Sequence, residues 1–280
     1  MGKRFFRTLL LFVSLSSLLW AQRPQHFEPG FNLFSKQQDI KLGQQNAAQV
    51  RKQMPMVNDP FLLEYVNKVG KRLANSQEAR ASGFPFTFEV VADPSINAFA
   101  LPGGPMFINT GLLKAVDNEA QLAGVMGHEM SHVILRHGTN QASKSKLIEL
   151  PAILGSQIAG GSVAGQLAQL GIGLGANSVL LKFSRTAESQ ADITGSHLMA
   201  EAGYNPVEMA RFFEKLQAQG GQGVPQFFSD HPNPDNRQHA IEAEARTLPL
   251  QTYTYQTGEF QRMKKAVAAI REPKPRPVAK

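Results

Sequence analysis

The stretch His128-Glu129-Met130-Ser131-His132 has the pattern H-E-x-x-H, and the residues on either side of it predict a helix. Asn118 is suited to cap the start of that helix, and Gly138 follows its expected last residue. Because residues four apart share one face of a helix, both imidazoles can bind one metal ion. Glu129 is about 100° further round the helix, where its carboxylate can hold a water molecule at that metal.

The same helix is apolar on nearly all of its faces, which predicts a buried helix. The apolar positions are Ala120, Leu122, Ala123, Val125, Met126, Val133, Ile134 and Leu135. H-E-x-x-H also occurs in proteins that bind no metal, but imidazole and carboxylate groups buried without partners cost several kcal/mol. A metal site here therefore requires a third ligand from elsewhere in the chain.

Residues 184–202 contain the best candidate for that third ligand. Glu188 and Asp192 are four apart on a predicted helix and therefore share a face. Glu188 suits the third ligand position, and Asp192 suits an acceptor that orients a ligand imidazole. The alternative is a solvent-exposed acidic face, although Ala187 and Ala191 beside the two carboxylates favour burial.

His137 is a competing third ligand. A metzincin would need glycine at position 135 and histidine at position 138, where this chain has Leu135 and Gly138, so that class is excluded. The C-terminal end of a helix dipole also favours a histidine. We therefore expect His137 to end the H-E-x-x-H helix rather than to bind the metal.

The first 21 residues have the features of a secretory signal peptide. A basic start with Lys3, Arg4 and Arg7 precedes an apolar run, and Ala21 suits the position before a cleavage site. The run is short for a membrane span, and an uncleaved anchor is the alternative. No cysteine is present, which excludes disulfides and a lipid-modified cysteine. We expect an exported protein of the periplasm, soluble or peripherally bound to a membrane.

The charge and length of the chain after residue 21 limit its possible partners and its number of domains. Removing residues 1–21 takes away three of the 29 basic residues and none of the 22 acidic ones, which leaves a net charge of +4. This mild charge, without a basic stripe interleaved with aromatics, argues against nucleic acid as a partner. We expect an extended arm over residues 22–34, one main domain over residues 35–250, and a C-terminal extension over residues 251–280 whose end is disordered.

The main domain combines helices with a few strands. Apolar spacing predicts a helix over residues 35–54 and another from residue 60, and residues 84–91 are β-rich. Residues 97–101 and 105–109 then predict two strands joined by a turn.

The pair of predicted strands over residues 97–101 and 105–109 has two interpretations. It can be a purely structural hairpin, or an edge strand beside the metal helix where an extended peptide pairs its backbone. We expect the second, with five residues that bind substrate: Asn97, Ala98, Phe99, Gly103 and Gly104.

Residues 150–181 form a glycine-rich segment without any charged residue between the expected ligand helices. A transmembrane hairpin, a membrane-facing pair of helices and a mobile cover over the site are the alternatives. Glycines and glutamines dilute its hydropathy, so a true span is the least favoured. We expect a cover that makes peripheral contact with a membrane.

A proline-fixed loop near residue 232 brings His231 and Arg237 to the start of a further helix. From the residues alone, this loop is equally an ordinary capped helix start or part of the site.

Taken together, these motifs resemble the HtpX-like gluzincin zinc metallopeptidases, peptidase family M48, and within them the periplasmic BepA/LoiP-like branch. The resemblance covers residues 35–246 and rests on four motifs in order: residues 97–104, H-E-x-x-H, Glu188 with Asp192, and His231-Pro232 with Arg237. It implies an α+β fold, a mostly helical zincin-type domain with a small antiparallel sheet or hairpin beside the H-E-x-x-H helix. A catalytic domain without TPR repeats and without a lipobox cysteine is expected.

The resemblance also implies one Zn²⁺ per chain, bound by His128, His132 and Glu188. Glu129 is then the catalytic base, and His231 and Arg237 become expected site residues. Either Arg237 or His231 can steady an oxyanion, and our hypothesis for His231 is that it reaches the open zinc position and holds the resting enzyme closed. The expected function is zinc-dependent endoproteolysis of misfolded or misassembled cell-envelope proteins. The alternative is an envelope-protein assembly factor or chaperone in which proteolysis is secondary, and an intact Glu129 favours the enzyme.

Overall fold

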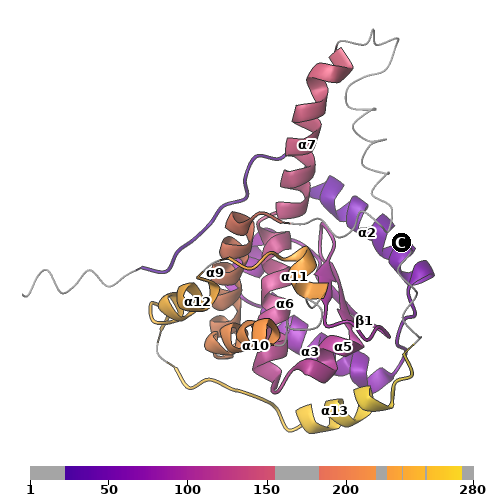
Figure 1. Ribbon diagram of the computed structural model, residues 1–280, viewed down its shortest axis with the longest axis vertical. Helices are drawn as coiled ribbons and strands as arrows, with labels where there is room; N and C mark the ends of the chain where they lie inside the picture. The colour runs from indigo at the N-terminus through magenta and orange to yellow at the C-terminus, as the bar shows by residue number, and fades with distance from the viewer. Residues whose placement is uncertain (1–22, 155–182, 219–225, 235, 250, 273–280) are drawn as a thin grey trace, which may run out of the picture.

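The computed structural model of the protein describes residues 23–154, 183–218, 226–234, 236–249 and 251–272 (Figure 1). Its strands are β1 (Thr87–Val91), β2 (Ala98–Ala100) and β3 (Pro105–Asn109). Before the metal-site motif lie the helices α2 (Lys36–Gln53), α3 (Pro60–Ala74), α4 (Gln77–Ser82) and α5 (Thr110–Ala115). The remaining described helices are α6 (Glu119–Ile134), α7 (His137–Leu154), α9 (Arg185–Glu201), α10 (Val207–Ala218), α11 (Gln226–Asp230), α12 (Arg237–Ala245) and α13 (Phe260–Ala269).

Side-chain caps explain why the helices start where they do. Ser35 and Gln38 form a reciprocal capping box at α2, so the first turn has partners for its free N–H groups. At α6 the Asn118 side chain accepts a hydrogen bond from the Gln121 N–H, and at α9 Ser184 accepts one from the Ala187 N–H. The predicted starts of the two ligand helices are thus confirmed.

The end of α6 differs from the prediction. The helix stops at Ile134, because Arg136 takes a left-handed backbone conformation with φ 56°, and α7 begins at His137. The Arg136 side chain explains this conformation, since Nε donates to Asp39 Oδ2 over 2.6 Å and Nη2 donates to the Phe34 carbonyl over 2.6 Å. The expectation that His137 ends the H-E-x-x-H helix was therefore wrong: His137 is the first residue of the next helix.

The sheet has the strand order β1-β3-β2. β2 and β3 form the expected antiparallel hairpin, with Phe99 opposite Phe107. β1 pairs in parallel with β3, with Glu89 opposite Phe107, so the sheet is mixed rather than purely antiparallel. The mostly helical α+β fold with a small sheet beside the H-E-x-x-H helix is confirmed.

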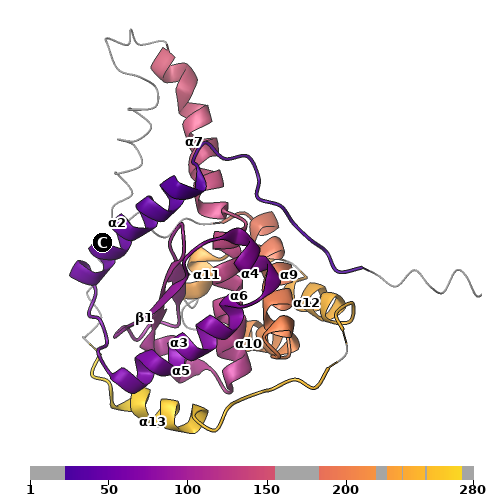
Figure 2. The ribbon, with the colours of Figure 1, turned by 180° about the vertical axis from the view of Figure 1, so that it is seen from behind.

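Helices cover both faces of the sheet. On one face Val91, Phe99 and Phe107 pack with Ala47 and Val50 of α2. On the other face strand residues join the main core, which includes Val90, Met106, Ile108, Leu62, Val66, Val125, Met126, Leu198 and Phe212. In both Figure 1 and Figure 2, α6 lies between the sheet and α9. The motif helix therefore occupies the centre of the domain.

One glycine fixes how α2 meets the hairpin. A Cβ on Gly43 would lie 1.8 Å from the Pro102 carbonyl oxygen, so only glycine permits this approach. The same hairpin turn contains Gly103 and Gly104, at φ 79° and 122°.

The two ends of the chain relate differently to this core. Residues 23–34 form neither helix nor strand, and both views show them running along the edge of the body to α7 (Figures 1 and 2). α13 contributes Phe260, Met263 and Val267 to the main core, so part of the expected C-terminal extension packs with the domain. The expected signal peptide, residues 155–181 of the glycine-rich segment and the expected disordered end at residues 273–280 lie outside the described residues.

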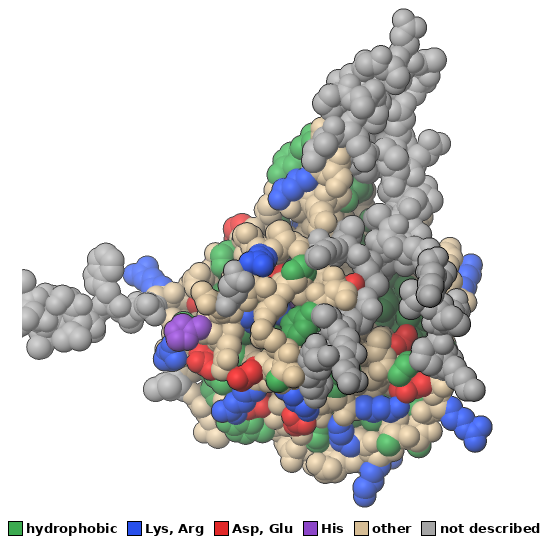
Figure 3. All heavy atoms as spheres, viewed as in Figure 1, with side chains coloured by type: hydrophobic (Ala, Val, Ile, Leu, Met, Phe, Trp, Pro, Cys, Tyr) green, Lys and Arg blue, Asp and Glu red, His purple; other side chains and the backbone are tan. Residues whose placement is uncertain are grey.

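Among the helices that the structure describes, none has the length and apolar character needed to cross a bilayer. On the face drawn in Figure 3, Lys and Arg side chains are interspersed with Asp and Glu side chains. That mixture agrees with the mild charge of the sequence.

Candidate metal centre

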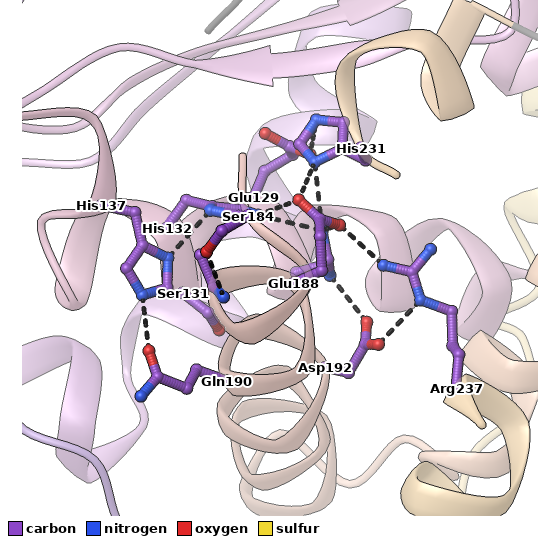
Figure 4. Close-up of polar contacts among 12 residues, drawn as sticks. Glu129, Ser131, His132, His137, Ser184, Glu188, Gln190, Asp192, His231 and Arg237 are labelled. Atoms are coloured by element: carbon purple, nitrogen blue, oxygen red, sulfur yellow. Dashed lines mark hydrogen bonds and ion pairs between the residues drawn. The ribbon is translucent and has the colours of Figure 1, made fainter. Parts of the chain in front are cut away.

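Four buried side chains converge between α6, α9 and α11: His128, His132, Glu188 and His231. The Nε2 atoms of His128 and His132 are 3.1 Å apart, and the Glu188 carboxylate lies 3.3 Å from the first and 3.5 Å from the second. Figure 4 shows Glu188 and His231 directed toward the same point. The two histidines four apart on α6 and the Glu188 of α9 are thus brought together as the sequence predicted.

Asp192 fixes the orientation of the first imidazole. Its Oδ1 lies 2.9 Å from His128 Nδ1, on the side of the ring that faces away from Glu188. As a buried carboxylate, Asp192 accepts the Nδ1–H, and the neutral ring then keeps its lone pair on Nε2.

His137 fixes the orientation of the second imidazole. His137 Nε2 is 3.1 Å from Gln190 Oε1, an acceptor, so this nitrogen donates and Nδ1 carries the lone pair. Burial also lowers the pKa of His137 to about 4, which keeps the ring neutral. His132 Nδ1, 3.0 Å away, therefore donates to His137, and the lone pair of His132 is on Nε2.

These hydrogen bonds test whether the site suits a metal ion. With both rings neutral, the two Nε2 lone pairs and the Glu188 carboxylate face one another, an arrangement that needs a cation between them. Burial lowers the pKa of His128, but its hydrogen bonds with Asp192 and Glu188 outweigh burial and raise that pKa, so this cation is either a proton on His128 or a metal ion. Four donors placed tetrahedrally about 2.1 Å from zinc would be about 3.4 Å apart. The observed separations among the donors of His128, His132, Glu188 and His231 run from 3.1 to 3.5 Å where they are closest. The residues present fit a zinc-sized cation.

His137 lies behind this centre and not within it. Its ring contacts the outer nitrogen of His132, and it does not belong to the group of converging donors. The position next to His132 made His137 a reasonable candidate from sequence, but the left-handed turn at Arg136 sends its side chain to the far side of the imidazole.

Glu129 lies beside the four converging donors. Its Oε1 is buried, 3.2 Å from His231 Nε2, and makes no hydrogen bond with any described residue. Burial raises the pKa of Glu129 to about 7, partly offset by the charge of His231 and a backbone hydrogen bond with Ala100. A buried carboxylate with a free oxygen next to metal ligands is able to exchange a proton.

The charges around Glu188 differ from those around Glu129. Burial raises the pKa of Glu188, but hydrogen bonds with His128 and His231 outweigh it and hold the pKa well below its usual range. Burial and the neighbouring His128 lower the pKa of His132 well below its ordinary value. One carboxylate is therefore held ionised among imidazoles, whereas the other is poised near neutral pH.

Arg237 pairs with both acidic residues of α9. Its Nη2 donates to Glu188 Oε2 over 2.8 Å and its Nε donates to Asp192 Oδ2 over 2.7 Å, as Figure 4 shows. The guanidinium also lies 4.3 Å from the centre of the Phe213 ring. Arg237, at the first position of α12, thus holds the two carboxylates from the side opposite the α6 imidazoles.

His231 contacts the ligands and the neighbouring carboxylate at once. Its Nδ1 is 3.1 Å from Glu188 Oε1 and 3.3 Å from His128 Nε2, while its Nε2 faces Glu129. The Phe227 ring stacks on the His231 ring with centroids 4.7 Å apart. From sequence this loop was as consistent with an ordinary helix start as with a site, and the structure brings it into the centre.

Sequence reasoning missed several aromatic and amide contacts. The Phe183 ring stacks on His132 with centroids 4.0 Å apart, and Phe213 and Phe227 surround His128. Gln190 orients His137 and lies two residues after Glu188 in the predicted helix. Of these missed contacts, it is the one that the sequence could have indicated, because it is a polar residue next to a predicted ligand.

The five residues expected to bind substrate are mostly enclosed. Asn97, Ala98 and Phe99 are buried, and the Asn97 amide donates to Asp230 Oδ2 over 3.1 Å. A Cβ on Gly103 would lie 2.4 Å from the Ile40 Cα, so the turn packs against α2. β2 is an edge strand of the sheet, where an extended peptide can pair its backbone, and the assignment stays a prediction.

A profile of peptidase family M48 matches residues 62–245, which include every element of the centre. The beta-barrel assembly-enhancing protease of Escherichia coli is 32% identical over 229 residues, an alignment that covers 79% of this chain and 46% of that protein. The mitochondrial metalloendopeptidase OMA1 of Schizosaccharomyces pombe is 32% identical over 180 residues, covering 64% of this chain and 51% of its own. The chain thus spans about half the length of these curated relatives. On the family match over residues 62–245 and the buried His-His-Glu-His cluster together, the chain belongs to peptidase family M48, a family of metallopeptidases.

Proposed function

We propose that this protein is a zinc-dependent endopeptidase that hydrolyses internal peptide bonds of misfolded or misassembled cell-envelope proteins. The observation that carries the proposal is the convergence of His128 Nε2, His132 Nε2 and the Glu188 carboxylate beside the free oxygen of Glu129. An arrangement of this kind suits hydrolysis, because it combines a metal site with a proton acceptor.

In this proposal His128, His132 and Glu188 hold one Zn²⁺. Zinc supplies a Lewis acid that polarises a scissile carbonyl and lowers the pKa of a water molecule to about 7. The chain's own residues prepare that chemistry by presenting three donors whose orientation is fixed by Asp192, His137 and Arg237.

Glu129 is the proposed base. It takes a proton from the attacking water and delivers it to the nitrogen of the leaving amine as the C–N bond breaks. Its buried position, which raises its pKa to about 7, suits a group that must both accept and release a proton near neutral pH.

Arg237 is proposed as a positioning residue. Two of its nitrogens are turned to Glu188 and Asp192, and the third nitrogen, Nη1, is buried without a hydrogen-bond partner among the described residues. This placement supports a role in orienting the two carboxylates in place of the oxyanion contact expected from sequence.

His231 is proposed to hold the resting enzyme closed. Its Nδ1 lies among the donors and its Nε2 lies 3.2 Å from Glu129 Oε1. In this position the imidazole excludes water from the place where the attacking water must lie, so the loop that carries His231, directly after α11, has to move before catalysis.

The substrate class and location are inferred from sequence features and relatives. The signal-peptide features favour export to the periplasm. The name of the Escherichia coli relative, a beta-barrel assembly-enhancing protease, supports envelope proteins as substrates. That name is equally consistent with the alternative function, an envelope-protein assembly factor in which cleavage is secondary. We further propose that the glycine-rich segment acts as a cover with peripheral membrane contact.

Metal analysis beside a casein digestion assay tests the function, with wild type compared with Glu129→Gln. We expect about one catalytic zinc per chain in both proteins and cleavage by wild type alone. Casein that remains intact with zinc-loaded wild type would favour the assembly factor.

A further inference from the structure

A second group of metal-binding side chains lies where the N-terminal arm, residues 23–34, crosses α4 and α9. His26 of the arm, Glu78 of α4 and His197 of α9 place one donor atom each within 4.8 Å of one another. His26 Nδ1 is 3.1 Å from Glu78 Oε1, and His197 Nδ1 is 2.9 Å from the same oxygen. These residues are remote in sequence, so the tertiary fold alone brings them together.

His197 has the arrangement of a preorganised ligand. It is buried, and its Nε2 lies 2.8 Å from Glu244 Oε1 of α12. A histidine that binds a metal commonly donates its other ring N–H to a carboxylate, which fixes the tautomer and raises the basicity of the ligand nitrogen. When the ring is neutral and donates Nε2–H to Glu244, the lone pair of His197 is on Nδ1, which faces Glu78 and the arm.

Glu244 is itself held in place. Its Oε1 accepts from the Gln25 backbone N–H over 2.8 Å, and its Oε2 accepts from Gln25 Nε2 over 3.2 Å. The residue before His26 is therefore bound to the same carboxylate that orients His197, so the arm is placed with its imidazole toward Glu78.

Glu78 leaves donor capacity unused. Both Nδ1 atoms approach its Oε1, whereas its Oε2 is buried without a hydrogen-bond partner among the described residues. Burial lowers the pKa of His197, but its hydrogen bonds with Glu78 and Glu244 outweigh burial and raise that pKa, so without a metal ion a proton on His197 lies between the two carboxylates. A divalent ion bound by the two Nδ1 atoms and the Glu78 carboxylate replaces that proton with a larger charge and gives the buried Glu78 Oε2 a partner.

We propose that His26, Glu78 and His197 form a second metal site, separate from the catalytic centre, that binds a divalent transition ion such as Zn²⁺ and fastens the N-terminal arm to α4 and α9. Two imidazoles and one carboxylate are donors that Zn²⁺ accepts, and His26 is the exposed ligand through which the ion enters.

The site would fix the arm near the first of its described residues. The other end of the arm is already bound to α7, where Asn32 Nδ2 donates to Thr139 Oγ1 over 2.7 Å and the Leu33 N–H donates to Ser143 Oγ over 2.9 Å. α9 also carries Glu188, so the ion would tie the arm to the helix that supplies the third catalytic ligand.

Zinc content per chain tests the proposal, measured on tag-free purified protein after equilibration with micromolar free zinc. We expect two ions in wild type and one in each of His26→Ala and Glu78→Gln, with affinity for the second ion at least about tenfold weaker. The matched control is His239→Ala, an exposed histidine on α12, which should keep two ions.

A double variant, His128→Ala with His132→Ala, separates this site from the catalytic one. It should keep one ion, and that ion should be lost when His26→Ala is added. If wild type binds only one ion and His26→Ala still binds that ion, then His26, Glu78 and His197 are an ion-paired cluster without a metal, and the proposal is overturned. Two ions in both arm-site variants would overturn it equally. A single ion in wild type that is lost in His26→Ala but kept in the double variant would support the arm site and refute the catalytic metal assignment alone.

Discussion

Gly195 of α9 lies directly against the backbone of His128 in α6: a Cβ on Gly195 would be 3.1 Å from the His128 nitrogen. Gly127 faces the same contact, since its Cβ would be 3.3 Å from the Gly195 carbonyl oxygen. Two glycines thus let the helices approach closely at the level of the first ligand. Glu188 and Asp192 lie on the preceding turns of α9, so this contact sets the distance across which they reach His128.

Gly195→Val should therefore disturb the metal centre without touching a ligand. A branched side chain in this contact forces the helices apart, and overpacking of this kind costs about 1–3 kcal/mol. We expect a lower urea midpoint and at least about tenfold weaker zinc binding. Gly258→Val is the matched control, because no atom lies within 4 Å of a Cβ there. Unchanged zinc affinity in a destabilised Gly195→Val protein would show that helix spacing does not set ligand geometry.

Glu129→Gln and Glu188→Ala should separate the base from the ligand. The amide introduced by Glu129→Gln cannot take a proton, so cleavage should fall by at least about a hundredfold while zinc stays bound. Glu188→Ala should lose both zinc and cleavage, because two imidazoles alone leave the site one donor short. Zinc content and casein digestion check both results. Full zinc affinity in Glu188→Ala would exclude Glu188 as a ligand.

The predictable parts of the centre depend on local sequence. The caps at Asn118 and Ser184, and the spacing of four between His128 and His132, are set within one helix, so they were readable from residues alone. The hairpin of β2 and β3 was readable for the same reason, since a glycine turn joins adjacent strands.

The parts that sequence reasoning missed depend on partners far along the chain. Arg136 is left-handed because Asp39 and the Phe34 carbonyl hold its side chain, and these partners lie about a hundred residues away. The parallel pairing of β1 with β3 is likewise set by tertiary contacts and not by the local sequence of either strand. His137 was misplaced because its environment, Gln190 and Phe183, comes from elements that no local pattern connects to it.

Asp192→Ala should weaken zinc binding or activity by roughly 10–100-fold without removing the metal. The substitution leaves His128 Nδ1 without its acceptor and Arg237 Nε without a partner, so both side chains lose their orientation. Zinc competition with a chromophoric chelator measures the change. Wild-type affinity and rate together would mean that Asp192 does not orient the ligand.

Tyr65→Phe should lower the stability of the domain by about 1–3 kcal/mol. The Tyr65 hydroxyl donates to the buried Glu119 carboxylate over 2.8 Å, and Tyr204 donates to the other oxygen over 2.7 Å. Phenylalanine removes one donor from a buried carboxylate, which then lacks part of its hydrogen bonding. Urea denaturation gives the comparison, and Tyr255→Phe, at an exposed tyrosine, should stay within about 0.5 kcal/mol of wild type.

His231→Ala should raise basal cleavage. The imidazole lies among the metal donors and 3.2 Å from Glu129 Oε1, so its removal frees the space that an attacking water must occupy. The stacked Phe227 ring would keep the wall of the site intact, because its contact with Phe213, at a centroid distance of 5.2 Å, does not involve His231. Initial rates on a quenched fluorescent peptide, at equal zinc content, measure the effect. His239→Ala, outside the centre, should cleave at the wild-type rate. A large loss of activity in His231→Ala would instead mean that this imidazole stabilises the transition state, and the proposed closed resting state would be wrong.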